Sequence, residues 1–379
     1  MGWLKLKEVG MKDGHIRKLM NIYNRYDELF REENFRLFNS GLKKNLEKSR
    51  NINLDSKIEL YERNKVRIID ANSQGYPEKL KELTDYPLFL YVKGKELKKG
   101  LNDERRNIAV VGTRKVTKFG KSACEKIVRE LLEYEVTLIS GLAEGIDTVA
   151  LSASVEKDGS AIAVVGSGLD IVYPYENKIL WEKISENGIL ISEHPLGTKP
   201  LKWNFPKRNR IIAALSDGIL IAESFKSGGA LITAELGFIM DKEIFAVPGF
   251  INYPSFEGCN NLIKENKAKL VTTGEDIARE FLWDLKNRKN KTDKLTYEEK
   301  IVFLQLSEEL GLEEIMKKIK NFNMNNDNNK NRDTLFENEF RPEKNRIDIP
   351  VNKLLSILMS LKVKGLISET GTARYMRIV

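Results

Sequence analysis

Six short apolar runs alternate with segments of helical length between residues 108 and 247, and no other feature constrains the fold as strongly. Runs without polar alternation are typical of strands that are buried on both faces. When helices connect successive strands, the strands run parallel in one sheet. The sequence therefore predicts an α/β fold with a mostly parallel sheet flanked by helices. The runs are IAVV (108–111), VTLI (136–139), AIAVV (161–165), ILI (189–191), ILIA (219–222) and IFAV (244–247).

The pattern of apolar and charged residues is different before and after this region. Residues 1–70 carry apolar side chains at helical spacing, for example Leu19, Ile22 and Tyr26, and predict a small helical domain. We assign residues 71–283 to the sheet-containing domain. The highly charged segment 284–295 predicts a linker.

Residues 296–379 predict a second small domain. Two helical segments flank an Asn-rich insert at 321–333, and the chain ends in an alternating pattern around Thr370 and Gly371. That ending is typical of a β-hairpin. Helices followed by a hairpin predict a winged-helix-like domain that carries the Asn-rich insert.

The net charge of +8 is unevenly distributed along the chain. Residues 1–100 hold 22 Lys and Arg against 15 Asp and Glu, whereas residues 108–260 hold 16 against 19. The predicted sheet domain is therefore slightly acidic. A site for a polyanion within it has to be a local basic patch.

Neither the apolar runs nor the cysteines indicate a membrane or an oxidising compartment. No apolar run reaches the length of about 18 to 20 residues that a membrane span needs, and the first residues lack the apolar stretch of a signal peptide. Cys124 and Cys259 are expected to be buried, reduced thiols. We expect a cytoplasmic protein that does not contact a membrane.

The stretch LKWNFPKRNR (201–210) combines cations and aromatic rings without an acid. Cations can follow a phosphate backbone, and an aromatic ring gives a face on which any base can stack, so the stretch favours a single-stranded nucleic acid. An ordinary solvated loop is the alternative. We expect Trp203 and Pro206 to anchor the loop. The side chains expected to make contact are Lys202, Phe205, Arg208 and Arg210.

Three glycine-rich turns each follow a predicted strand and precede a helix, where unpaired N–H groups favour anions. They lie at 112–114, 140–141 and 227–229. Arg114 adds a planar guanidinium suited to phosphate, although it could also be solvated beside a simple tight turn. We expect Asp147 to cap a helix or tie loops together rather than to catalyse a reaction.

The sequence lacks the residues that the common enzyme chemistries require. It contains neither a P-loop nor a G-x-G-x-x-G fingerprint at the first turn, which disfavours bound NAD. Two histidines and two distant cysteines cannot build a zinc site. We therefore expect no catalytic residue, metal or cofactor, and a structural role for His194.

Many ordered motifs in this chain resemble those of the DNA-processing protein A family, also called Smf. The resemblance is strong over about 70–280, moderate at the C-terminus and weak before residue 70. Thr113 stands where Ser is commoner, and the Asn-rich insert is unusual. The motifs are YPEKLKELTDYPLFLYVKG (76–94), VVGTR (110–114), SGLAEGID (140–147), GSGLDIVYPYEN (166–177), PLKWNFPKRNRIIAALSDGILIAES (200–224), SGGALITAELG (227–237), AVPG (246–249) and LKVKGLISETGTARY (361–375).

The resemblance implies an extended Rossmann-like core that binds single-stranded DNA, forms a homodimer and loads a RecA-type recombinase during natural transformation. It implies that Phe205 stacks on a base, with Arg114 and Lys202 in the same pocket. Together with the turns above, the expected DNA-binding residues are Gly112, Thr113, Arg114, Ser140, Gly141, Lys202, Phe205, Arg208, Asn209, Arg210, Ser227, Gly228 and Gly229.

Two other functions stay open from the sequence. Gly228, Gly229, Thr233 and Glu235 loosely resemble the active-site turn of Rossmann-like nucleotide N-glycosidases, although the spacing differs. Alternatively, the C-terminal winged-helix-like domain could make the chain a sequence-specific regulator that binds duplex DNA.

Overall fold

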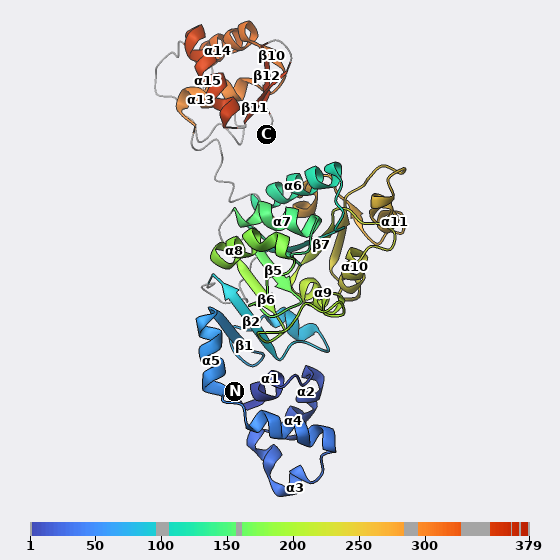
Figure 1. Ribbon diagram of the computed structural model, residues 1–379. Helices are drawn as coiled ribbons and strands as arrows, with labels where there is room; N and C mark the ends of the chain where they lie inside the picture. Colours follow the sequence, from blue (N-terminus) through green and yellow to red (C-terminus); the bar gives the residue numbers. More distant parts are fainter. Residues whose placement is uncertain are drawn as a thin grey trace. The chain divides into compact units, whose positions relative to one another are not determined.

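The computed structural model describes residues 2–95, 106–156, 161–283, 295–326, 349–364, 366–370 and 373–377. The chain forms two compact units, 1–284 and 285–379, which are described separately (Figure 1). Except for Leu295, the predicted linker at 284–295 lies outside the described residues, and so does most of the Asn-rich insert.

The first unit is built around one sheet, which among the described residues has nine strands in the order β1-β2-β6-β5-β4-β3-β7-β8-β9. From β6 to β9 all neighbours are parallel, whereas β1 and β2 are antiparallel additions at one edge. The predicted α/β fold is confirmed, and the six predicted runs form β3 to β8. The strands are β1 (Val66–Asp70), β2 (Phe89–Gly94), β3 (Arg106–Val111), β4 (Val136–Ser140), β5 (Ala161–Val165), β6 (Ile189–Ser192), β7 (Gly218–Ile221), β8 (Glu243–Ala246) and β9 (Lys269–Leu270).

Helices cover both faces of this sheet, as Figure 1 shows. Strands β4 and β5 are buried along their whole length, which explains why they contain no charged residue. One layer contains α6 (Lys118–Leu132), α7 (Ile146–Val155), α8 (Lys178–Asn187) and α12 (Gly274–Glu280). The other contains α9 (Asn204–Leu215) and α10 (Ala230–Ile239), while α11 (Glu257–Lys264) follows β8.

The chain reverses its direction across the sheet at β3. Strands β4, β5 and β6 are added on one side of β3, and β7, β8 and β9 are added on the other. In open α/β sheets, the crevice at the carboxyl ends of strands near such a reversal is the usual binding place. We therefore expect a binding site at the loops that leave β3, β4, β5 and β7.

The N-terminal helices pack directly on the antiparallel edge of the sheet. Leu4, Leu6 and other apolar side chains share a core with Leu88 and Phe89. The Asp13 carboxylate also accepts a hydrogen bond of 3.2 Å from the Leu88 N–H. Helices were predicted up to residue 70, but 66–70 forms β1 of the large sheet. The helices are α1 (Gly2–Glu8), α2 (Asp13–Ile22), α3 (Glu32–Phe35), α4 (Ser40–Arg50) and α5 (Leu54–Arg63).

The second unit combines helices with a small antiparallel sheet of order β10-β12-β11. Strands β11 and β12 pair antiparallel, with Thr370 opposite Arg374, as the predicted hairpin requires. Gly371 of its turn lies outside the described residues. The elements are α13 (Tyr297–Gln305), β10 (Leu310–Gly311), α14 (Leu312–Asn326), α15 (Val351–Val363), β11 (Ile367–Thr370) and β12 (Arg374–Arg377).

Cys124 and Cys259 are both buried and form no disulfide bond, and burial raises the pKa of each thiol. Among the described residues, no helix has the length and apolar character needed to cross a membrane.

Candidate functional site

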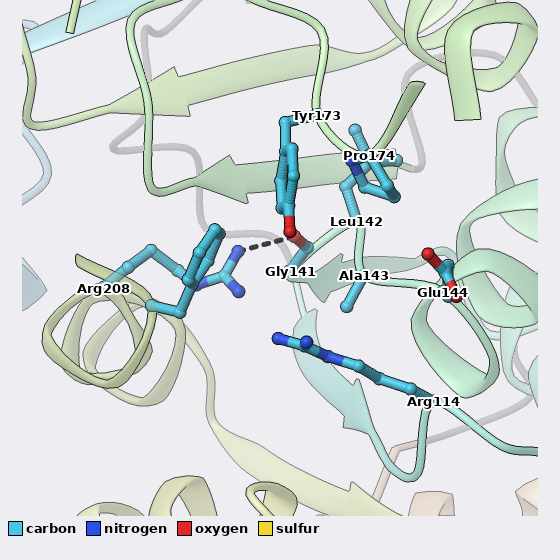
Figure 2. Close-up of a pocket in the computed structure, with 9 residues that line it drawn as sticks. Arg114, Gly141, Leu142, Ala143, Glu144, Tyr173, Pro174 and Arg208 are labelled. Carbon is cyan, nitrogen blue, oxygen red and sulfur yellow. Dashed lines mark hydrogen bonds between the residues drawn. The ribbon is translucent and has the colours of Figure 1, made fainter. Parts of the chain in front are cut away.

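A small open pocket lies at the carboxyl ends of β3, β4 and β5, with about 310 Å³ of space that is partly open to solvent. The pocket brings together Arg114, Gly141, Phe205 and Arg208 from the predicted site. Figure 2 shows Arg208 reaching Gly141, with Tyr173 above and Arg114 below the Gly141 loop in this view. The remaining lining residues are Leu142, Ala143, Glu144, Tyr173 and Pro174.

The turn that presents Arg114 is fixed on two sides. The Thr113 N–H donates to the Glu223 carbonyl at 2.8 Å, and the Thr113 carbonyl accepts from the Ile146 N–H at 3.1 Å. Gly112 permits this close approach, since a Cβ there would lie 2.5 Å from the Ile146 side chain. The backbone therefore holds Arg114 in place while its side chain stays exposed.

Two aromatic rings meet beside the Arg114 guanidinium. The rings of Tyr173 and Phe205 are tilted by 31°, with their centroids 5.4 Å apart. The Arg114 Cζ atom lies 5.9 Å from the Phe205 ring centroid, within the range of a cation–π contact. A planar, negatively charged ligand would find both a ring face and a guanidinium here.

Arg208 is largely buried and supports the pocket from within. Its Nη1 donates to the Gly141 carbonyl at 2.6 Å and also to the Val164 carbonyl. Burial lowers the pKa of Arg208 to about 10, although the nearby Asp147 favours the charged form. We predicted that Arg208 contacts single-stranded DNA; in the structure these bonds tie its guanidinium to the ends of β4 and β5.

Asp147 holds the same loop from the other side, as the sequence analysis expected. Its Oδ2 accepts from the Gly141 N–H at 3.1 Å and from the Ala143 N–H at 3.4 Å. Burial raises the pKa of this carboxyl, which Arg208 partly counteracts. Arg208 and Asp147 are thus two buried groups of opposite charge, and they hold Gly141 by its carbonyl and its N–H respectively.

The sequence predicted an open cationic surface without acids around Arg210 and Lys207. In the structure, the Glu193 carboxylate contacts both side chains. The Glu193 Oε2 lies 2.6 Å from Arg210 Nη2 and 3.2 Å from Lys207 Nζ. Arg210 also pairs with Asp85, at 3.0 Å. Burial opposes the ionisation of Glu193, but Arg210 and Lys207 outweigh it and hold the pKa below its ordinary value. Acids from distant segments therefore neutralise the basic stretch on this side.

His194 adjoins the same buried ion pairs. Its backbone N–H donates to the Ser192 hydroxyl at 3.0 Å, whereas its Nε2 is buried and has no hydrogen-bond partner among the described residues. Burial lowers the pKa of the imidazole to about 4 from an ordinary 6.5.

This shift predicts a loss of stability in mild acid. Below pH 6.5 the unfolded chain binds a proton that the folded chain excludes until about pH 4, so the free energy of unfolding falls through this window. The loss due to His194 is expected to reach up to about 3 kcal/mol. Urea unfolding near neutral pH and in mild acid, compared with His194→Gln, measures it. Equal pH dependence in both proteins would contradict the prediction.

The remaining residues of the basic stretch differ in their exposure to solvent and in their contacts. Lys202 is exposed at the start of α9, and Asn209 accepts a hydrogen bond of 3.2 Å from Arg208 Nε. Trp203 was expected to anchor the loop, but 68% of it is exposed, so that prediction is wrong. Pro206 is exposed as well.

Of the two other glycine-rich turns, the one at 140–141 contributes Gly141 to the pocket and the one at 227–229 contributes no residue to it. Ser140 is buried and donates to the Val110 carbonyl at 2.6 Å, so it joins β4 to β3. The turn at 227–229 follows β7 and does not line the pocket. Thr233 is buried in α10, whereas Glu235 on the same helix is exposed. The N-glycosidase resemblance therefore gains no support from the pocket.

Sequence reasoning missed Tyr173, Pro174 and Glu144 as pocket residues. Tyr173 and Pro174 belong to the GSGLDIVYPYEN motif but were not among the expected DNA-binding residues. Their position at the exit of β5 was the available signal, because the exits of neighbouring parallel strands meet at one edge. Among the residues that the structure describes, no group of His, Cys, Asp and Glu is arranged to hold a metal.

Comparisons with known proteins agree with this fold and these motifs. DNA processing protein DprA from Streptococcus pneumoniae is 43% identical over 207 residues, which cover 54% of this chain and 71% of that protein. A crystal structure of DprA from the same species matches with a TM-score of 0.63 and 34% identity, covering 74% of this chain and 98% of that one.

A second solved structure concerns DNA processing protein A from Helicobacter pylori and its single-stranded DNA binding mode. It matches with a TM-score of 0.52 and 27% identity, covering 57% of this chain and 95% of that one. Residues 67–282, more than half of the chain, match the sequence pattern of the family called DNA recombination-mediator protein A. The chain therefore belongs to the DNA recombination-mediator protein A family.

Proposed function

We propose that this chain binds single-stranded DNA, without a preferred sequence, at the pocket formed by Arg114, Tyr173 and Phe205. The observation that carries the proposal is that a guanidinium and two ring faces share one open pocket. A cation near the backbone releases counterions on binding, and a ring stacks on any base. The pocket requires unstacked bases, which a duplex does not offer.

The fold of a relative supports the same ligand. The start of α6 adds no anion site, because the buried Glu223 carboxylate already accepts a hydrogen bond there from the Thr117 N–H at 3.0 Å. The Helicobacter pylori relative, whose reported structure concerns single-stranded DNA binding, has the same fold over most of its length. Family membership and site chemistry thus point to the same class of ligand.

We extend the proposal to the role that the family resemblance implies. The chain would act as a non-enzymatic, cytoplasmic homodimer that protects incoming single-stranded DNA and loads a RecA-type recombinase during natural transformation. Membership of a family named for recombination mediators supports this role. The C-terminal unit would serve as a winged-helix-like accessory domain. DNA would also approach Lys202, Gly112 and Thr113 at the rim.

A salt titration of DNA binding tests the ligand class. Because Arg208 and Arg210 are committed to partners within the protein, we expect the pocket to neutralise about two or three phosphates. A plot of log affinity for oligo-dT against log salt concentration should then have a slope of about −1.4 to −2. Fluorescence anisotropy of a labelled oligonucleotide measures this slope.

A duplex of the same length is the matched control. We expect it to compete poorly for the labelled strand, because its bases remain stacked on one another. Equal competition by the duplex, or an affinity that does not change with salt, would contradict the proposal.

A further inference from the structure

Trp203 exposes an aromatic surface that the fold does not use. Its exposed fraction is 68%, whereas Trp181 on α8 is only 4% exposed. Trp203 lies in a turn closed by a 2.9 Å hydrogen bond from the Asn204 N–H to the Leu201 carbonyl, and α9 begins with the next residue. Exposing so large a ring forgoes the stabilisation that burial would provide.

The position of Trp203 separates it from the pocket at Phe205. Trp203 has helical backbone angles and directly precedes α9, so the helical spacing already applies to it. Side chains two positions apart on a helix point to nearly opposite sides, and Phe205 is two positions further on. Phe205 lines the pocket and Trp203 does not. The two rings therefore offer separate faces on either side of the start of α9.

Two exposed cations lie close to Trp203 along the chain. Lys202 is the other central residue of the same turn and is exposed. Lys207, one helical turn after Trp203, is half exposed although it pairs with Glu193. An exposed ring beside exposed lysines suits an anionic ligand with flat groups better than an apolar protein partner.

We propose that Trp203 and Lys202 form a second nucleotide-binding subsite for the DNA strand that occupies the Phe205 pocket. A base further along the strand than the one at Phe205 stacks on the Trp203 ring, while Lys202 contacts the phosphate backbone between the two bases. This inference rests on the proposed single-stranded DNA binding and gives the strand its path across the start of α9.

Intrinsic fluorescence of the full chain tests the subsite. Oligo-dT of about 16 nucleotides is expected to quench tryptophan emission, and Trp203→Phe should remove most of the quenching. Trp203→Ala should weaken binding of this strand about 5- to 150-fold. An oligo-dT of about four nucleotides, which the Phe205 pocket can hold alone, should lose little affinity.

Trp203→Leu is the matched control, because it keeps an apolar side chain but lacks a ring. We expect it to bind like Trp203→Ala, and Trp203→Phe to restore most of the affinity. If the wild-type chain binds the long strand but Trp203→Ala binds it equally well and no quenching occurs, the subsite is wrong and the proposed function stands. If the wild-type chain binds neither strand, the proposed function itself fails and the subsite with it.

Discussion

Replacing Arg208 with alanine is expected to lower the free energy of unfolding of the first unit by about 3 to 5 kcal/mol. The change removes the donor to the Gly141 and Val164 carbonyls and leaves Asp147 buried without its opposite charge. The cost is this large because two buried carbonyls lose their donor and the Asp147 charge is still removed from water. All four tryptophans lie in the first unit, so urea unfolding followed by tryptophan fluorescence reports on that unit alone.

A second variant separates the buried charge from the lost hydrogen bonds. Asp147→Asn keeps an oxygen that can accept from the Gly141 and Ala143 N–H groups, but it carries no charge. In the Arg208→Ala background, Asp147→Asn is therefore expected to recover part of the lost stability, giving a coupling of about 0.5 to 3 kcal/mol. If Arg208→Ala leaves the stability unchanged, the guanidinium does not hold the loop and is free to contact a ligand.

The sequence predicted the central strands well because their burial leaves a local signal. Strands β3 to β8 are nearly continuous apolar runs, and each is followed by a segment of helical length. Strand β1 gave no such signal, since only Val66 of its five residues is buried. Its place is set by pairing with β2, a contact between segments that are far apart in sequence. Such pairing is not encoded by local spacing.

The chemistry of the basic stretch was harder to predict than its location. A run without acids predicted an open cationic surface, but Glu193 and Asp85 approach it from other segments. Helical spacing did contain a usable signal, because Asn204 and Arg208 are four residues apart and both are buried. Trp203 was expected to anchor the loop, and only the structure shows that it is exposed.

Replacing both Arg114 and Phe205 with alanine is expected to weaken oligo-dT binding by about 2.5 kcal/mol or more, close to a hundredfold in Kd. Removing the Phe205 ring removes a stacking face worth about 1 to 3 kcal/mol per base. Removing Arg114 removes a hydrogen bond to a charged group, worth about 1.5 to 3 kcal/mol. Fluorescence anisotropy at fixed salt measures the loss.

The two single variants should differ in how salt affects them, which separates stacking from charge. Arg114→Ala is expected to flatten the log–log salt slope by about 0.7 to 1, because one phosphate contact is lost, whereas Phe205→Ala should weaken binding at an unchanged slope. Arg114 Cζ lies 5.9 Å from the Phe205 ring centroid, so the two losses should not be additive. Arg114 is exposed and Phe205 is half-buried, so urea unfolding should show a folded double variant. A folded double variant that binds oligo-dT as tightly as the wild-type chain would show that the DNA site lies elsewhere.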